Sequence, residues 1–243
     1  MIAIILVAGY ATRLYPLTLD RPKALLPIGG RPILDYICDE IDSVEDIHKT
    51  VLVSNDKFYA SFLDWVETRR PRAELAVLND GTRVEGARLG AIGDIRFALQ
   101  KENIREDIAV IAGDNFFTYR LADFCRFYRE RGADCLAVKK MPDREALKSM
   151  GVVISDAAGR VLELEEKPQN PRSDVAAYAS YIYKEDTLPL FSEYLDNNGQ
   201  PDAPGNFVAW LCARKPVWAW FIDGECYDVG THASYDEVCR KYG

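Results

Sequence analysis

Two cations near the start of this sequence have the charge and the setting to bind a phosphate. Arg13 follows a turn of mostly small residues, Ala8-Gly9-Tyr10-Ala11-Thr12, and Lys23 lies a little further along. Backbone N–H groups of such a turn can face a phosphate while the two charged side chains close over it. A solvated loop that carries cations is the other interpretation of the same spacing.

Two isolated aspartates much further along are candidate ligands for a metal ion. Asp114 follows the apolar run Ile108–Ala112 and Gly113, where we expect the glycine to leave room for a close ligand. Asp228 ends a second, later strand. Mg²⁺ prefers a few carboxylates together with phosphate or water oxygens, so the pair suits one Mg²⁺ and a phosphorylated substrate. Asp114 could equally cap the next turn.

Two other polar groups are less informative. Glu165-Glu166-Lys167-Pro168 ends a strand whose alternation already predicts polar residues, so a surface charge cluster explains it as well. His48 and His232 are too few and too far apart in the chain for a catalytic triad or a metal site. We expect both histidines to be structural or to face solvent.

Short apolar runs alternate with amphipathic helices over the first part of the chain. This pattern predicts an α/β fold with a doubly wound, mostly parallel, Rossmann-like sheet covered on both faces. Such sheets bind ligands at the carboxyl ends of their strands, so loops 9–23, 79–90 and 113–115 should converge. The predicted strands are Ile2–Val7, Thr50–Val53, Glu74–Leu78, Ile108–Ala112 and Cys135–Val138, and the predicted helices are Pro32–Asp42, Leu89–Lys101, Leu121–Arg131 and one capped by Asn55 or Asp56 that ends near Arg69.

Past Asp143 the pattern changes and predicts a small antiparallel insertion. A hairpin-like turn, Asp156-Ala157-Ala158-Gly159, separates two short apolar runs. Thr231 is a candidate N-cap for a last helix that reaches Tyr242. The expected elements between these points are strands Val152–Ile154, Val161–Leu164 and Ala177–Tyr183, helices Thr187–Leu195 and Phe207–Arg214, and strands Val217–Ile222 and Cys226–Val229.

The composition argues against nucleic-acid binding, a membrane span and secretion. A formal net charge of −8 over 243 residues argues against a nucleic-acid partner, because binding to a phosphate backbone wants a basic surface. No apolar stretch approaches the length of a membrane span, and the N-terminal apolar run lacks the basic region of a signal peptide. The six cysteines are scattered singly, which is typical of free thiols in a reducing cytoplasm.

Several short motifs, taken together, resemble the signature of sugar-phosphate nucleotidylyltransferases, the NDP-sugar pyrophosphorylases. They occur in the family's order over nearly the whole chain, and the closest resemblance is to short glucose-1-phosphate thymidylyltransferase or uridylyltransferase-like proteins without an appended acyltransferase or β-helix domain. The motifs are Leu6–Thr18, Arg21–Pro27, Gly113-Asp114-Asn115, Gly151-Val152-Val153, Glu166-Lys167-Pro168 and Asp228-Val229-Gly230-Thr231.

The resemblance implies a nucleotide-diphospho-sugar transferase-like fold and a Mg²⁺-dependent reaction. An NTP and a sugar 1-phosphate would give an NDP-sugar and pyrophosphate, with dTTP or UTP favoured and CTP allowed. It further implies one nucleotidyltransferase domain over residues 1–243, with a nucleotide-binding half at about 1–140 and a sugar-binding, metal-completing half at about 141–243. Family members are often dimers or tetramers, so a homo-oligomer stays open, although no stretch of this sequence identifies an interface.

Carried over by position, the resemblance also implies roles for individual residues. Arg13, Lys23 and Lys167 would neutralise phosphate charge, and Asp114 and Asp228 would hold the Mg²⁺. Asn79 would read the base and Gly90 would pass close under it. The nucleotide-binding set is then Ala8, Gly9, Ala11, Thr12, Arg13, Asn79 and Gly90, and the set that binds the sugar phosphate is Gly151, Glu166, Lys167, Tyr178 and Tyr181.

Three departures from the family pattern concern the site, and the one in loop Asp80–Arg88 leaves the identity of the base open. Ala11 replaces the usual second glycine, and we expect a negative φ there because a methyl group is otherwise strained. Tyr178-Ala179-Ser180-Tyr181 stands where the family has a Thr-Gly pair, an apolar residue and Tyr. One alternative is therefore a cytidylyltransferase acting on a non-sugar or cyclitol phosphate. Another is a non-catalytic homologue that binds nucleotide-sugars as a regulatory subunit.

Overall fold

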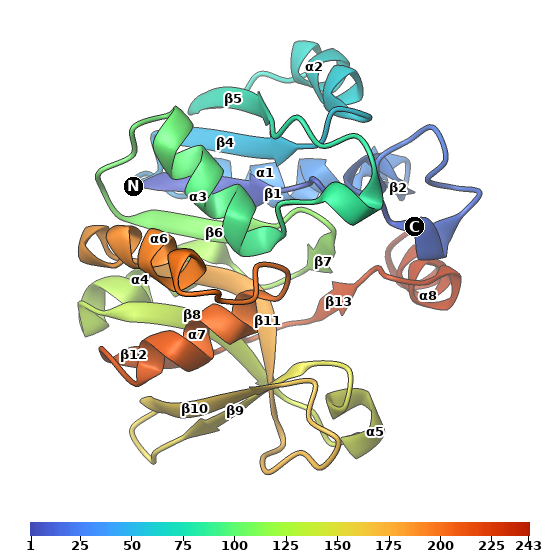
Figure 1. Ribbon diagram of the computed structural model, residues 1–243. Coiled ribbons are helices and arrows are strands. Elements are labelled where there is room, and N and C mark those ends of the chain that lie inside the picture. The colour runs from blue at the N-terminus through green and yellow to red at the C-terminus, as the bar shows by residue number, and fades with distance from the viewer.

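A nine-stranded mixed sheet with helices on both faces forms the centre of the computed structural model, which describes residues 1–243 (Figure 1). One half of the sheet is parallel, with β5 (Glu74–Asn79), β4 (Lys49–Ser54), β1 (Ile2–Leu6) and β6 (Ile108–Ala112) side by side in that order. Helices cover both faces of β1, which explains its unbroken apolar sequence. The predicted α/β class with a mostly parallel core is confirmed.

The second half of the sheet is built around β11 (Val175–Tyr183). This strand runs antiparallel to β6 and separates it from β8 (Asp134–Lys140), which in turn pairs in parallel with β12 (Val217–Phe221). Near its start, β11 also pairs with β9 (Gly151–Ser155), and β9 forms an antiparallel hairpin with β10 (Val161–Glu166). This hairpin is the antiparallel insertion expected from the sequence, and it lies at the bottom of Figure 1.

Alternate side chains of β1 divide the core into two layers. Ala3, Ile5 and Val7 pack against one set of helices, while Ile2 and Ile4 pack against another. The first layer is covered by α1 (Ile33–Asp42), α2 (Tyr59–Glu67), α4 (Leu121–Arg131) and α8 (His232–Tyr242), and the second by α3 (Ala91–Lys101), α6 (Leu188–Asp196) and α7 (Pro204–Cys212). A short helix, α5 (Arg144–Leu147), was not predicted.

Helix ends follow the local signals at α8 but not at α2, and α7 begins at Pro204 rather than at the predicted Phe207. Thr231 caps α8 as predicted, because its side chain accepts a hydrogen bond from the Ser234 N–H. The prediction that Asn55 or Asp56 caps α2 is wrong, since that helix begins only at Tyr59. The Asn55 side chain instead accepts a hydrogen bond from the Phe58 N–H at 3.0 Å and donates one to the Ala8 carbonyl at 2.9 Å. Asn55 therefore ties this turn to the loop that follows β1.

Two small ribbons stand outside the main sheet. In one of them β7 (Asn115–Phe117) runs antiparallel to β13 (Cys226–Asp228). In the other, β2 (Pro27–Ile28) and β3 (Arg31–Pro32) flank a Gly29–Gly30 turn, where φ is 56° and 80°. None of the helices combines the length and the apolar character needed to cross a membrane.

Candidate functional site

A cavity of about 200 Å³ lies where the loops after β1, β5 and β6 meet. The prediction that loops 9–23, 79–90 and 113–115 converge agrees with this arrangement, because each contributes to its wall. The polar and small lining residues are Gly9, Tyr10, Ala11, Thr12, Arg13, Lys23, Glu85, Arg88, Asp114 and Gly230. Five of the predicted nucleotide-binding or catalytic positions in the first 23 residues therefore face one space.

Lys23 is the centre of the charged part of this site. Its Nζ lies 2.8 Å from Asp114 Oδ2 and 3.1 Å from Asp228 Oδ1. The lysine side chain is only 8% exposed, whereas the two carboxylates are 44% and 63% exposed. Burial alone would lower the pKa of Lys23, but the charges of Asp114 and Asp228 outweigh it and raise that pKa. Lys23 is consequently a cation at neutral pH.

The β7–β13 ribbon explains why two aspartates far apart in the sequence meet here. Asp114 sits in the turn between β6 and β7, directly before Asn115. Asp228 is the register partner of Asn115 across the ribbon. Lys23 opens a short 3₁₀ helix, Lys23–Leu25, which holds it beneath the two carboxylates.

Arg13 also lines this cavity, and its guanidinium lies near Gly230 and Asp228. It lies in the 3₁₀ helix Thr12–Leu14. A Cβ placed on Gly230 would be 3.0 Å from Arg13 Nη2 and 3.2 Å from Asp228 Oδ2, so the glycine fills the narrow gap between them. Arg13, Lys23 and Asp114 thus line the cavity, and Asp228 contacts Lys23 beside it, an arrangement suited to a ligand with several phosphates.

Ala11 adopts a left-handed conformation, with φ 49° and ψ 41°. The expectation of a negative φ is therefore wrong. Such a backbone costs an alanine roughly 1 kcal/mol, because its Cβ crowds the following carbonyl. The Thr18 hydroxyl donates a hydrogen bond to the Ala11 carbonyl at 2.8 Å and helps to hold this turn.

The two glycines nearest these loops serve different purposes. Gly9 is exposed and nothing lies within 4 Å of a Cβ built on it, so a ligand can approach its backbone. Gly113 does not leave room for a ligand as we expected, because a Cβ there would overlap Val7 Cγ1 and lie 2.9 Å from Ile5 Cγ2. Its small size instead lets β6 and its turn pack tightly against β1.

The residues predicted to read and support the base do not line this cavity. The Asn79 side chain donates to Asp56 Oδ1 and accepts from the Gly81 N–H, both at 2.8 Å. A Cβ on Gly90 would lie 2.6 Å from the Pro201 carbonyl carbon, so this glycine packs against a neighbouring loop. Their roles toward a base remain predictions.

Three polar lining residues, Tyr10, Glu85 and Arg88, were not predicted from the sequence. Tyr10 lies inside the recognised motif and donates from its hydroxyl to the Thr82 carbonyl at 3.0 Å. Glu85 accepts a hydrogen bond from the Thr12 hydroxyl at 3.4 Å, and Arg88 stands beside it in the wall. Only the position of Tyr10 within the motif was available as a sequence signal, since the path of loop 79–90 is set by tertiary contacts.

Glu166 lies at a second polar position, where β10, β9 and α7 meet. Gly151 is its register partner on β9, and Gly205 of α7 packs so closely that a Cβ there would overlap Glu166 Oε2. Burial raises the pKa of Glu166 despite the opposing charge of Lys167. Lys167 itself has a φ of 50°, which is uncommon for a lysine. Strained backbone of this kind is often found at functional sites.

The two tyrosines predicted to bind the sugar phosphate belong to different core layers. Tyr178 packs in the layer with α1, α2 and α4, and burial raises its pKa to about 12. Tyr181 packs in the other layer, where burial and the nearby charge of Glu166 raise its pKa. Of the two, Tyr181 is the one placed near Glu166.

Asp114 and Asp228 form a donor set that fits Mg²⁺ shared with a substrate. No group of three or more His, Cys, Asp or Glu side chains gathers in the molecule, so a closed metal cage is not built from protein alone. The two carboxylates converge on one cation, Lys23, and both remain partly exposed, at 44% for Asp114 and 63% for Asp228. Mg²⁺ commonly binds through one or two carboxylates and substrate phosphates, which matches this arrangement.

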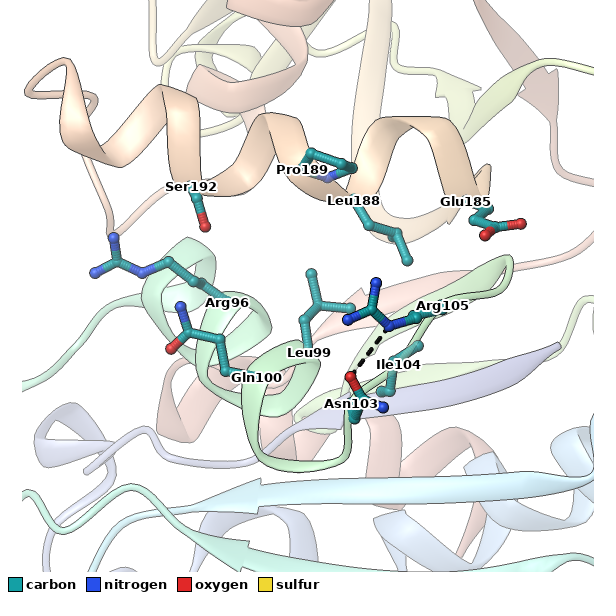
Figure 2. Close-up of a pocket in the computed structure, with 10 residues that line it drawn as sticks. All are labelled: Arg96, Leu99, Gln100, Asn103, Ile104, Arg105, Glu185, Leu188, Pro189 and Ser192. Atoms are coloured by element: carbon teal, nitrogen blue, oxygen red, sulfur yellow. Dashed lines mark hydrogen bonds between the residues drawn. The ribbon is translucent and has the colours of Figure 1, made fainter.

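A larger cavity of about 390 Å³ lies elsewhere, between α3 and α6 (Figure 2). Arg105 points into this groove, and its Nε donates to Asn103 Oδ1 at 3.2 Å. None of the predicted site residues lines the groove. Of these two cavities, only the smaller is therefore lined by predicted site residues, and it is the candidate site.

Comparison with known proteins shows the family to which the chain belongs. The model of the nucleotidyl transferase family matches residues 2–243. A provisionally named mannose-1-phosphate guanyltransferase of Sulfolobus acidocaldarius is 32% identical over 188 residues, which are 76% of this chain and 49% of that protein. The UTP–glucose-1-phosphate uridylyltransferase AglF of Haloferax volcanii is 28% identical over 247 residues, with 99% of this chain and 96% of that one covered.

The solved structures extend the likeness at the level of the fold. A UDP-glucose pyrophosphorylase in complex with UDP-glucose superposes with a TM-score of 0.85 at 20% identity, covering 99% of this chain and 97% of the other. The chain spans about half the length of the first curated relatives it matches.

Proposed function

Because this chain belongs to the nucleotidyl transferase family, we propose that it transfers a nucleotidyl group from an NTP to a sugar 1-phosphate, giving an NDP-sugar and pyrophosphate. The observation that carries the proposal is the convergence of Lys23 on Asp114 and Asp228, with Arg13 across the same cavity. This set offers cations for a triphosphate and carboxylates for its metal ion in one place.

The reaction asks for positioning and charge neutralisation rather than a covalent nucleophile. A phosphate oxygen of the sugar 1-phosphate attacks the α-phosphorus in line, and the bond to the β-phosphate breaks to release pyrophosphate. In our proposal Arg13 stabilises the charge that grows on the leaving pyrophosphate, and Lys23 binds oxygens near the α-phosphate. The open backbone at Gly9 lets the triphosphate lie close to the turn. A Mg²⁺ held by Asp114 and Asp228 would neutralise phosphate charge.

The sugar phosphate is proposed to bind on the side of Glu166. This carboxyl group is held in place by Gly151 and Gly205, and it can accept hydrogen bonds from sugar hydroxyls. Lys167, which is 63% exposed, is free to reach the phosphate of the same ligand. The proposal keeps the division into a nucleotide half at about 1–140 and a sugar half at about 141–243.

For the nucleotide we propose dTTP or UTP first and CTP second. The uridylyltransferase AglF, which aligns with nearly all of this chain, supports UTP among these nucleotides. A cytidylyltransferase acting on a cyclitol or other non-sugar phosphate is the alternative, and it rests on the bulky Tyr178 in β11.

The six cysteines form no disulfides, which supports a cytoplasmic setting for the reaction.

The test is pyrophosphate release over a matrix of NTPs and phosphorylated acceptors, with and without Mg²⁺. The acceptors comprise sugar 1-phosphates, cyclitol phosphates and phosphocholine. We expect Mg²⁺-dependent turnover with one NTP and one sugar 1-phosphate far above the rest. Turnover only with CTP and a non-sugar phosphate would support the alternative. If no substrate pair releases pyrophosphate, although the protein is folded and binds an NDP-sugar, this result would contradict catalysis and favour a regulatory homologue.

A further inference from the structure

The Lys23 ammonium occupies the point where Asp114 and Asp228 meet. It contacts both carboxylates, at 2.8 and 3.1 Å, and it is far more shielded than either of them. Any other cation that bridges the same two carboxylates must either displace this ammonium or lie next to it. The Lys23 ammonium and a divalent ion would therefore compete for the same two carboxylates.

We infer that Lys23 is a placeholder cation that keeps a divalent ion out of the Asp114–Asp228 site until the phosphates of the nucleotide draw the ammonium away. This inference rests on the proposed function, since it assumes that a triphosphate enters the cavity beside Lys23. It adds an order to the reaction: the metal ion enters with the nucleotide or after it, and the nucleotide-free protein binds divalent ions poorly.

Electrostatics explains why the two cations exclude each other. Mg²⁺ and Mn²⁺ bind carboxylate oxygens at about 2.0–2.1 Å, so an ion held by both aspartates would lie within a few ångström of an ammonium that touches the same oxygens. Repulsion between charges at that separation is substantial in a partly buried site. Lys23 is enclosed by the protein, so it cannot simply turn into bulk solvent to relieve that repulsion.

The phosphates of the nucleotide can replace Asp114 and Asp228 as partners of the Lys23 ammonium. Its phosphate oxygens are strong acceptors for a charged N–H donor, so the ammonium can leave the aspartates without losing its hydrogen bonds. The released carboxylates then face the same phosphates and can share a metal ion with them. Until that exchange, Lys23 also holds Asp114 and Asp228 together, which offsets the repulsion between two neighbouring negative charges.

Binding of Mn²⁺ alone, without nucleotide, tests the inference directly. Its affinity is measured by the electron paramagnetic resonance signal of free Mn²⁺ for the full chain and for Lys23→Met, which keeps the length of the side chain and removes its charge. We expect the variant to bind one Mn²⁺ at least tenfold more tightly than the wild type. Lys23→Arg, which keeps the charge, should bind as weakly as the wild type.

A double variant shows whether the tight Mn²⁺ binding depends on the Asp114–Asp228 pair, and Lys23→Gln serves as a second neutral variant. Adding Asp228→Asn to Lys23→Met should abolish the tight binding, because one of the two carboxylates is lost. Lys23→Gln takes the place of Lys23→Met if that protein fails to fold, as judged by its thermal unfolding. Equal Mn²⁺ affinity of the wild type and the neutral variants would overturn the inference, and so would tight binding by Lys23→Arg.

These outcomes are separate from those of the proposed function. Pyrophosphate release by the wild type, together with unchanged Mn²⁺ binding in Lys23→Met, would refute the placeholder and leave the transferase standing. Tight Mn²⁺ binding by Lys23→Met, together with no turnover of any substrate pair by the wild type, would support exclusion by Lys23 and refute the transferase.

Discussion

Asp228 lies opposite Asn115 across the β7–β13 ribbon, and this one register brings the carboxylates of Asp114 and Asp228 to the same lysine. The ribbon is short and stands apart from the main sheet, and besides placing these side chains it packs Phe116, Phe117 and Cys226 into the core. The charged centre of the site is thus assembled by one pairing between distant parts of the chain.

Removing either carboxylate should abolish most of the transfer activity. We expect Asp114→Asn and Asp228→Asn each to lower kcat for pyrophosphate release by a factor of about a hundred or more, because a metal ion contributes several kcal/mol of charge stabilisation. Asp123→Asn is the matched control, since this aspartate pairs only with Arg126 on the surface of α4. Wild-type turnover in Asp114→Asn would show that the metal assignment is wrong.

The Glu166 side chain should contribute to binding of the sugar 1-phosphate but not of the NTP. In Glu166→Gln we expect KM for the sugar 1-phosphate to rise at least tenfold while KM for the NTP changes less than about twofold, because the charged hydrogen-bond acceptor faces the proposed sugar side. The control is Glu163→Gln on the same strand, whose side chain is exposed and pairs with Arg172. Equal effects on both KM values would place Glu166 outside the sugar site.

The glycine at the end of β6 should be indispensable for packing. Gly113→Ala is expected to lower the free energy of unfolding by about 1–3 kcal/mol, because the new methyl group overlaps Val7 in a tightly packed layer. Gly86→Ala, where nothing lies within 4 Å of the added Cβ, should change it by less than about 0.5 kcal/mol. Urea denaturation monitored by circular dichroism gives both values, and a neutral Gly113→Ala would contradict the observed packing.

Asp94 should make the stability of the fold depend on pH. Burial, reinforced by the charges of Asp80 and Asp202 and opposed by Arg88, raises its pKa to about 8. Its Oδ1 is buried without a hydrogen-bond partner. An unfolded aspartate titrates near about 3.9, so the folded protein binds the extra proton between these values and loses stability as pH rises from about 4 to about 8.

Asp94→Asn removes this titration. The variant should be more stable than the wild type at pH 8, on the order of a few kcal/mol at most, and the difference should shrink steadily toward pH 4. Thermal unfolding of both proteins across this range measures it, with Asp123→Asn again as the surface control. Parallel pH profiles for the wild type and Asp94→Asn would mean that Asp94 is not titrating in this way.

Local patterns in the sequence were sufficient for most individual elements. Helix α4 was predicted at Leu121–Arg131 and is observed with those bounds, and Gly132 follows it with the positive φ expected of a helix end. Strand β6 was likewise predicted without error. Side-chain periodicity, caps and turn residues act within a few positions along the chain, so they can be interpreted without knowing the fold.

Several features of the site followed from contacts that no local pattern records. The place of β11 between β6 and β8, the overlap that makes Gly113 a packing residue and the left-handed Ala11 all depend on segments far away in the sequence. The capture of Lys23 by two aspartates depends on them as well. Which distant segments pair is decided by burial and register across the whole molecule, since a shift of one residue would turn every side chain of a strand to the other face. By itself the sequence determined the elements, the motif residues and their order, whereas the tertiary structure decided which of those residues meet.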